Sequence, residues 1–207
     1  MSKINYTCSL GILCHSSQIL KRNMYKTCSY PFDWVFSGSN IIIDCLEDNF
    51  HTFLDKSYYI NISESECGHS KYSYNMFNHH NPLIHEEHYN YYTRCVNRFK
   101  VLLQKPEHKL FLMIFVNLDF IDENTKNEVI DFNNKFSKYT SNYTLLVIFH
   151  IRNKQENHHI FTYNNNIHFL ELNTLSESSG SKFFDENDNI YLDNVLKSNY
   201  DFSILPL

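Results

Sequence analysis

One cysteine, Cys14, stands where a predicted strand runs into a predicted helix. Residues 4–10 alternate in a β-compatible pattern, and residues 16–24 have the spacing of an amphipathic helix. A helix N-terminus favours a thiolate and lowers the pKa of a cysteine. In an open parallel sheet this position also lies at the carboxyl ends of the strands, where ligands bind. The position therefore predicts a nucleophile, and the alternative is a small residue packed in the core.

A thiol nucleophile needs a base that accepts its proton and a third group that orients the imidazole. Three histidines of the Asn- and His-rich segment 78–88 are candidates for the base: His79, His80 and His85. His150 is a further candidate, because it ends an apolar strand at the same predicted edge. His15 is excluded, since consecutive side chains on a helix point about 100° apart.

Two residues are candidates for the group that orients this histidine. Asn117 ends a predicted strand, and Asp33 lies in a loop that follows the first helix. Asp33 is alternatively expected to form an ion pair with Arg94 or Arg98. These two arginines lie on one face of a predicted helix, at positions i and i+4, and predict either a clamp for a carboxylate or phosphate or an ordinary solvated face.

A metal site is an alternative use of the histidine-rich segment. Its possible ligands are His79, His80, His85, Glu86, Glu87 and His88. The HEEH sequence is one residue shorter than the HExxH pattern of zinc enzymes, so we expect no metal. The sequence has only four glycines and neither a GxSxG nor a GxGxxG motif, so we also expect no nucleotide and no other cofactor.

The apolar pattern predicts the α/β class. We expect strands at residues 6–10, 110–117, 143–150 and 167–172, and the second and third are continuous apolar runs, typical of strands covered on both faces. We expect helices at residues 41–54 after an N-cap at Ser39, at 85–105 before Pro106, at 122–139 and at 190–197. The prediction is a single three-layer domain over residues 1–207, with a mostly parallel central sheet and a polar excursion at about 57–82.

Composition excludes several classes of partner. The 207 residues have a formal net charge of −5 and no basic stripe, which argues against nucleic acid. The longest strongly apolar run, residues 110–116, is far shorter than the roughly 20 residues that span a bilayer, so we expect no membrane partner. No signal peptide precedes the first strand, and six cysteines without a CxxC pair indicate free thiols. We therefore expect a cytoplasmic protein.

Residues 9–37 resemble the opening segment of an uncharacterised family described as papain-like cysteine peptidases. That family begins with Ser-Leu-Gly, two further residues and Cys, here residues 9–14, and continues to Pro-Phe-Asp-Trp, here residues 31–34. The family's Phe-x-His element is matched by Phe77 and His79. Its Tyr- and Arg-rich helix ending in Arg-Phe is matched by residues 91–99, and its following apolar strand by residues 110–116.

The resemblance implies that Cys14 is the nucleophile and His79 its base. Asp33, which lies in the matched segment, is the first candidate for the third group, and Gly11, Arg94 and Arg98 are the candidate substrate-binding residues. His80, His150 and Asn117 remain secondary candidates for the catalytic site.

We expect a cysteine-dependent hydrolase or acyl-transfer enzyme that acts on a peptide or another acyl substrate, with backbone amides of the Cys14 helix holding the oxyanion. One alternative is a non-catalytic binding protein that retains the fold. Another is an enzyme that acts on glycans or phosphate-bearing substrates through Arg94 and Arg98.

Overall fold

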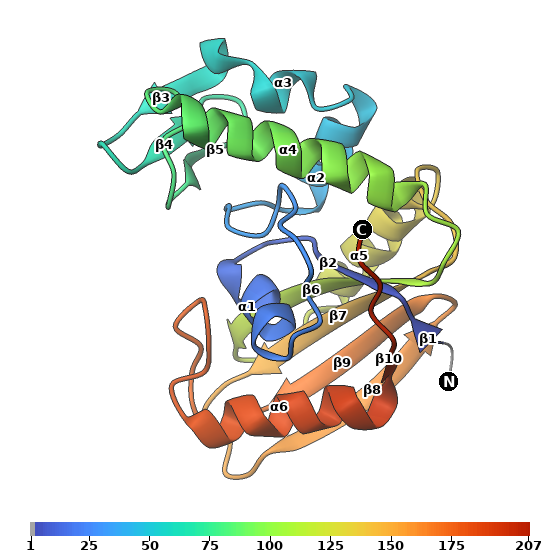
Figure 1. The fold of residues 1–207 in the computed structure, drawn as a ribbon. Coiled ribbons are helices and arrows are strands. Elements are labelled where there is room, and N and C mark those ends of the chain that lie inside the picture. The colour runs from blue at the N-terminus through green and yellow to red at the C-terminus, as the bar shows by residue number, and fades with distance from the viewer. Residues whose placement is uncertain (1–2) are drawn as a thin grey trace.

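A computed structural model describes residues 3–207, and a five-stranded sheet lies at its centre. The strands run in the order β2 (Tyr6–Ser9), β6 (Lys109–Leu118), β7 (Tyr143–Ile151), β9 (Ile167–Asn173) and β8 (His158–Asn164). The first four are parallel, and β8 pairs antiparallel to β9 at the edge. A mixed, mostly parallel sheet with helices confirms the α/β class (Figure 1).

Residues 3–207 also form six α-helices. They are α1 (Cys14–Arg22), α2 (Ser39–Glu47), α3 (His51–Leu54), α4 (Glu86–Leu103), α5 (Glu123–Phe136) and α6 (Glu186–Asn199). Alternate side chains of β6 enter two different apolar clusters: Leu112 packs with residues of α1 and α6, and Met113 packs with residues of α2 to α5. This double burial explains why β6 and β7 have continuous apolar sequences.

The predicted polar excursion contains a second, smaller sheet. A 3-10 helix (Lys56–Tyr58) leads into three antiparallel strands, β3 (Tyr59–Asn61), β4 (Cys67–His69) and β5 (Ser73–Phe77). The N–H of Phe36 donates to the carbonyl of Met76 at 3.2 Å and joins β5 to the loop before α2. Phe53, Phe77 and Tyr92 pack their rings together beneath this sheet, so the excursion shares an apolar cluster with α3 and α4.

Several predicted boundaries are wrong. The helix expected at residues 41–54 is two helices, because Asn49 and Phe50 have left-handed backbones with φ of 56° and 64°. Its N-cap is Gly38 rather than Ser39, which is the first helical residue. The last helix begins at Glu186, where the Asp185 side chain accepts the N–H of Asn187 at 2.9 Å.

Besides the strands of the smaller sheet, three strands were not predicted. β8 is an edge strand with a largely exposed sequence, so it lacks the apolar run of a buried strand. β1 (Lys3–Ile4) and β10 (Asp201–Phe202) are only two residues long and pair in parallel, bringing the two ends of the described chain side by side. Within residues 3–207, no helix is both long enough and apolar enough to cross a membrane.

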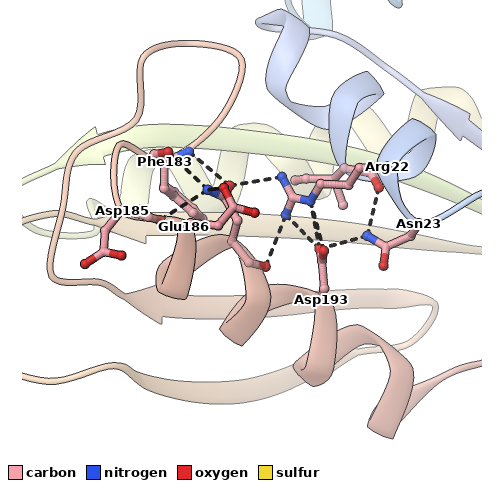
Figure 2. Close-up of polar contacts among 8 residues, drawn as sticks. Arg22, Asn23, Phe183, Asp185, Glu186 and Asp193 are labelled. Atoms are coloured by element: carbon pink, nitrogen blue, oxygen red, sulfur yellow. Dashed lines mark hydrogen bonds and ion pairs between the residues drawn. The ribbon is translucent and has the colours of Figure 1, made fainter.

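A polar network fixes α1 to α6 (Figure 2). The Arg22 guanidinium donates to the Asp193 carboxylate through Nη2 at 2.7 Å and through Nε at 2.9 Å. Arg22 Nη1 also donates to Asn189 Oδ1 at 3.1 Å, and Asn23 Nδ2 donates to Asp193 Oδ1 at 2.7 Å. The Asn189 side chain in turn exchanges two hydrogen bonds with the backbone of Phe183, each 3.1 Å long. The network therefore couples α1 to the loop that precedes α6.

We expect Asp193→Ala to lower the free energy of unfolding by about 2 kcal/mol, because it leaves a half-buried guanidinium without its charged acceptor. Asp201→Ala is the matched control, since Asp201 is exposed and should change stability by less than about 0.5 kcal/mol. Urea titration at neutral pH measures both. If the two variants have equal free energies of unfolding, the Arg22–Asp193 network does not stabilise the fold.

Candidate active site

The turn between β2 and α1 has an unusual backbone that sets the position of Cys14. Gly11 has φ of 80° and Ile12 has φ of 76°, so two successive residues are left-handed. Glycine adopts this conformation at little cost, whereas a β-branched residue such as Ile12 is strained there. Such strain is found where a side chain or backbone group must be held in one place.

Hydroxyl groups hold this turn. Ser9 Oγ accepts the N–H of Gly11 at 3.1 Å and lies 2.7 Å from Ser16 Oγ, and Ser37 Oγ accepts the N–H of Ile12 at 3.2 Å. A Cβ added to Gly11 would lie 2.0 Å from Ser37 Oγ, so no larger residue fits. The predicted substrate-binding residue Gly11 thus has a clear packing role, and Ser37 was missed by the sequence reasoning because it is distant in the chain.

Cys14 is the first residue of α1, and its sulfur lies beside His79. The distance from Cys14 Sγ to His79 Nε2 is 3.6 Å, which is within range of a sulfur hydrogen bond. Cys14 is half-buried, and His79 is exposed in the segment that follows β5. For His79 to accept the thiol proton at Nε2, the ring must carry its own hydrogen on Nδ1, and in residues 3–207 that nitrogen has no hydrogen-bond partner. The structure thus brings together the two residues singled out as nucleophile and base.

The expected low pKa of Cys14 is wrong in direction. Burial raises the pKa of this thiol, the N–H of its own backbone lowers it in part, and the charge of Asp33 raises it further. Desolvation therefore outweighs the hydrogen bond from the backbone N–H of Cys14. The shift favours the thiol over the thiolate, so a nucleophilic Cys14 would need an acceptor for its proton.

The N-terminus of α1 has no side-chain cap within residues 3–207. Its N-cap residue is Leu13, whose side chain has no oxygen and makes no capping hydrogen bond. The first amide groups of a helix have no partner within the helix, so they point toward whatever lies before it. At Cys14 that space is next to the sulfur, where amide donors could stabilise an oxyanion.

The two other base candidates of the same segment, His80 and His85, have different partners. His80 Nδ1 lies 3.5 Å from the Tyr92 hydroxyl, and its ring stacks on Tyr91 with centroids 5.0 Å apart. Burial lowers the pKa of His80. His85 is the N-cap of α4, and its Nε2 lies 3.0 Å from the carbonyl oxygen of Glu64. Neither ring contacts Cys14.

His150 is fully occupied by other hydrogen bonds. Its Nδ1 accepts the backbone N–H of Asn117 at 3.0 Å. Its Nε2 donates to Thr174 Oγ1 at 2.7 Å, because that hydroxyl already donates its own hydrogen to Ser176. Burial lowers the pKa of His150 to about 4, so the ring is neutral and has no free lone pair for a thiol proton.

The Asn117 side chain binds the loop before α6 rather than the ring of His79. Its side chain donates to the carbonyl of Ser178 at 2.8 Å and accepts the N–H of Ser178 at 2.7 Å. Ser178 Oγ then lies 2.8 Å from His15 Nδ1, and the His15 ring packs edge-on against Phe183 at 4.7 Å. Burial lowers the pKa of His15 to about 3. His15 is therefore enclosed in the core, as expected for a residue that does not serve Cys14.

Asp33 forms an ion pair with Lys26, and the prediction that it pairs with Arg94 or Arg98 is wrong. It is buried and also accepts the N–H of Tyr30 at 2.6 Å. Lys26 reaches it from the loop after α1, which puts the ammonium closer than either arginine of α4. Burial raises the pKa of Asp33 although Lys26 opposes this shift. No hydrogen bond joins Asp33 to His79 in the described chain.

Arg94 and Arg98 remain without ion-pair partners among residues 3–207. Arg94 is exposed and Arg98 is half-buried on α4. No group of three or more His, Cys, Asp or Glu side chains in the same residues is arranged to hold a metal ion. The histidine-rich segment thus contributes one base candidate, His79, rather than a ligand set.

Comparison of the chain with known proteins gives no match among family models, curated proteins or solved structures. The resemblance of residues 9–37 to papain-like cysteine peptidases therefore stays a prediction.

The buried histidines predict an acid-sensitive fold. Histidine in an unfolded chain titrates near pH 6.5, whereas burial puts the pKa of His15 at about 3 and that of His150 at about 4. Between these values the unfolded chain binds protons that the folded chain does not. The free energy of unfolding should therefore decrease as the pH falls below about 6.5, by up to about 1.4 kcal/mol per pH unit for each histidine.

Urea titrations at pH 7, 6 and 5 measure this loss. We expect His15→Gln to lower stability at pH 7 but to flatten the pH dependence. His158→Gln should keep the wild-type slope, because His158 is exposed on β8. The same slope in the wild type and in His15→Gln would contradict the assignment of the proton uptake to His15.

Proposed function

We propose that the protein is a cysteine-dependent hydrolase or acyl-transfer enzyme, with Cys14 as nucleophile and His79 as base. The observation that supports this most directly is the 3.6 Å distance between Cys14 Sγ and His79 Nε2 at the N-terminus of α1. A nucleophile and a base within hydrogen-bond reach of each other form the minimal unit of covalent acyl transfer.

The reaction follows from these two groups. The Cys14 thiol gives its proton to His79 Nε2 as Sγ forms a bond to the substrate carbonyl carbon. The tetrahedral intermediate collapses when the carbonyl double bond re-forms, and His79 returns the proton to the departing amine, alcohol or thiol. Water or another acceptor then loses a proton to His79, attacks the acyl carbon and releases the acyl group, and the thiol is restored.

The first amides of α1 supply the remaining stabilisation. They donate to the oxyanion that forms on the carbonyl oxygen during both attacks. Because the raised pKa keeps Cys14 protonated, proton transfer to His79 accompanies the attack instead of preceding it. This differs from an enzyme with a preformed thiolate, which reacts without help from a base.

The substrate and the setting are part of the proposal. A peptide or isopeptide bond is what the resemblance to papain-like peptidases implies, and an ester or thioester fits the same chemistry. The six unpaired cysteines support a reducing, cytoplasmic compartment. The two apolar clusters, each shared between the central sheet and helices, support a single three-layer domain.

A non-catalytic binding protein is the second candidate. Two observations favour it: His79 is exposed and lacks a group that orients its ring among the described residues, and burial raises the pKa of Cys14. An enzyme that binds a glycan or phosphate through Arg94 and Arg98 is a third candidate, because neither arginine has an ion-pair partner in that part of the chain. That enzyme would lose activity on Arg94→Ala and keep it on Cys14→Ala.

The reactivity of Cys14 distinguishes these candidates. In labelling by iodoacetamide, Sγ forms a bond to the methylene carbon, iodide leaves and the thiol proton passes to the base. We expect His79→Gln to slow the labelling of Cys14 at pH 7 by at least about tenfold, because the raised pKa leaves little thiolate without the imidazole. Mass spectrometry of the labelled peptides measures the rate at each of the six cysteines.

His80→Gln is the matched control, since the neighbouring ring faces Tyr91 and Tyr92 and should not affect the rate at Cys14. If His79→Gln labels as fast as the wild type, His79 is not the base. The binding-protein candidate would then be preferred.

A trapped intermediate tests the covalent step itself. We expect a panel of thioesters and activated esters to leave an acyl group on Cys14, seen as added mass on the intact protein after acid quenching. Cys14→Ala should abolish this adduct, and Cys28→Ala should retain it, because Cys28 is another half-buried thiol away from His79. Hydrolysis that continues at the wild-type rate in Cys14→Ala would overturn the proposed mechanism.

A further inference from the structure

A cleft of about 580 Å³ opens between the N-terminus of α2 and the side of α5. Its volume is in the range of ligand-binding sites in proteins. Apolar side chains from four separate segments contribute to its lining, among them Ile12, Phe36, Phe115 and Phe132. Phe115 belongs to the carboxyl-terminal half of β6, so the cleft lies toward the edge of the sheet at which Cys14 lies.

The cleft is continuous with the turn that positions Cys14. Ile12 lines the cleft and precedes the nucleophile by two residues, so their Cα atoms are at most about 7 Å apart. Ser37 also lines the cleft, and its hydroxyl accepts the N–H of Ile12. The strained conformation of Ile12 thus places its side chain in the cleft wall while the chain turns toward Cys14.

The charges along one side of the cleft are mainly acidic. Glu128 and Asp131 lie three residues apart on α5, both exposed, and Lys135 follows four residues later. None of the three makes an ion pair within residues 3–207. Because two carboxylates and only one ammonium group line this side, it favours a ligand with a cationic group. The apolar lining residues lie next to that position.

We propose that this cleft binds the acyl side of a peptide substrate, with an apolar side chain next to the reacting carbonyl and a basic side chain one residue before it. The apolar side chain contacts Ile12 and Phe115, and the basic side chain meets Glu128 and Asp131. The proposal rests on the proposed function, because it uses Cys14 as the group that attacks the carbonyl carbon.

Three peptide chloromethyl ketones of equal length test this assignment. The first has lysine followed by phenylalanine, the second replaces lysine by norleucine, and the third replaces phenylalanine by alanine. In each case Sγ of Cys14 forms a bond to the methylene carbon, chloride leaves and His79 accepts the thiol proton. The second-order rate of Cys14 labelling is measured by mass spectrometry.

We expect the lysine–phenylalanine probe to react about fivefold faster than the norleucine probe, which corresponds to one exposed ion pair. It should react about tenfold faster than the alanine probe, because burial of an aromatic side chain in a pocket gives that discrimination. In the double variant Glu128→Gln/Asp131→Asn, the lysine and norleucine probes should label Cys14 at equal rates. The lysine–phenylalanine probe should still react faster than the alanine probe. Lys135→Gln is the matched control and should keep or increase the preference for lysine.

Labelling by iodoacetamide distinguishes a failure of the cleft assignment from a failure of the proposed function, because iodoacetamide is too small to fill the cleft. Normal iodoacetamide labelling of the wild type with equal rates for all three peptide probes would overturn the cleft assignment and leave the proposed function standing. A lysine preference that survives in Glu128→Gln/Asp131→Asn would overturn the role of the two carboxylates. If iodoacetamide labels Cys14 equally fast in the wild type and in His79→Gln, the proposed function is overturned instead.

Discussion

The left-handed turn at Gly11 and Ile12 is the constraint on which the candidate site depends. A strand that ends at Ser9 must reverse direction within four residues for a helix to begin at Cys14. Ser37 lies so close to Gly11 that a side chain there has no room, and its hydroxyl holds the next amide. The turn therefore fixes the direction of α1, the location of its free amide groups and the location of the sulfur. A change at this point would alter all three together.

The apolar pattern was sufficient to predict the main sheet because burial on both faces leaves a strong signal. The strands expected at 110–117 and 143–150 coincide with β6 and β7 to within two residues at each end. Local backbone conformation was harder to predict. Nothing in the helical spacing of residues 41–54 indicates the left-handed Asn49 and Phe50. The Phe50 ring is buried against Phe99 of α4, and this tertiary contact overrides the local helical pattern.

For the candidate site, the amino-acid sequence could not show which residues lie close together in the fold. The choice of Cys14 followed from a strand-to-helix boundary, whereas the choice of His79 among its neighbours followed from a resemblance of motifs. The ion pair of Asp33 with Lys26 depends on the path of an irregular loop, for which no periodicity exists. The direction of the pKa shift of Cys14 depends on how much of its sulfur is covered, which only the folded structure shows.

The proposed nucleophile and base follow strands of different sheets: Cys14 lies in α1, after β2 of the central sheet, and His79 follows β5 of the smaller antiparallel sheet. A backbone hydrogen bond between Phe36 and Met76 and a shared group of aromatic rings hold the smaller sheet in place. Relative displacement of the two sheets by a single ångström would separate sulfur and nitrogen. The distance between the Cys14 sulfur and the His79 nitrogen therefore depends on how firmly the smaller sheet packs against the rest of the described chain.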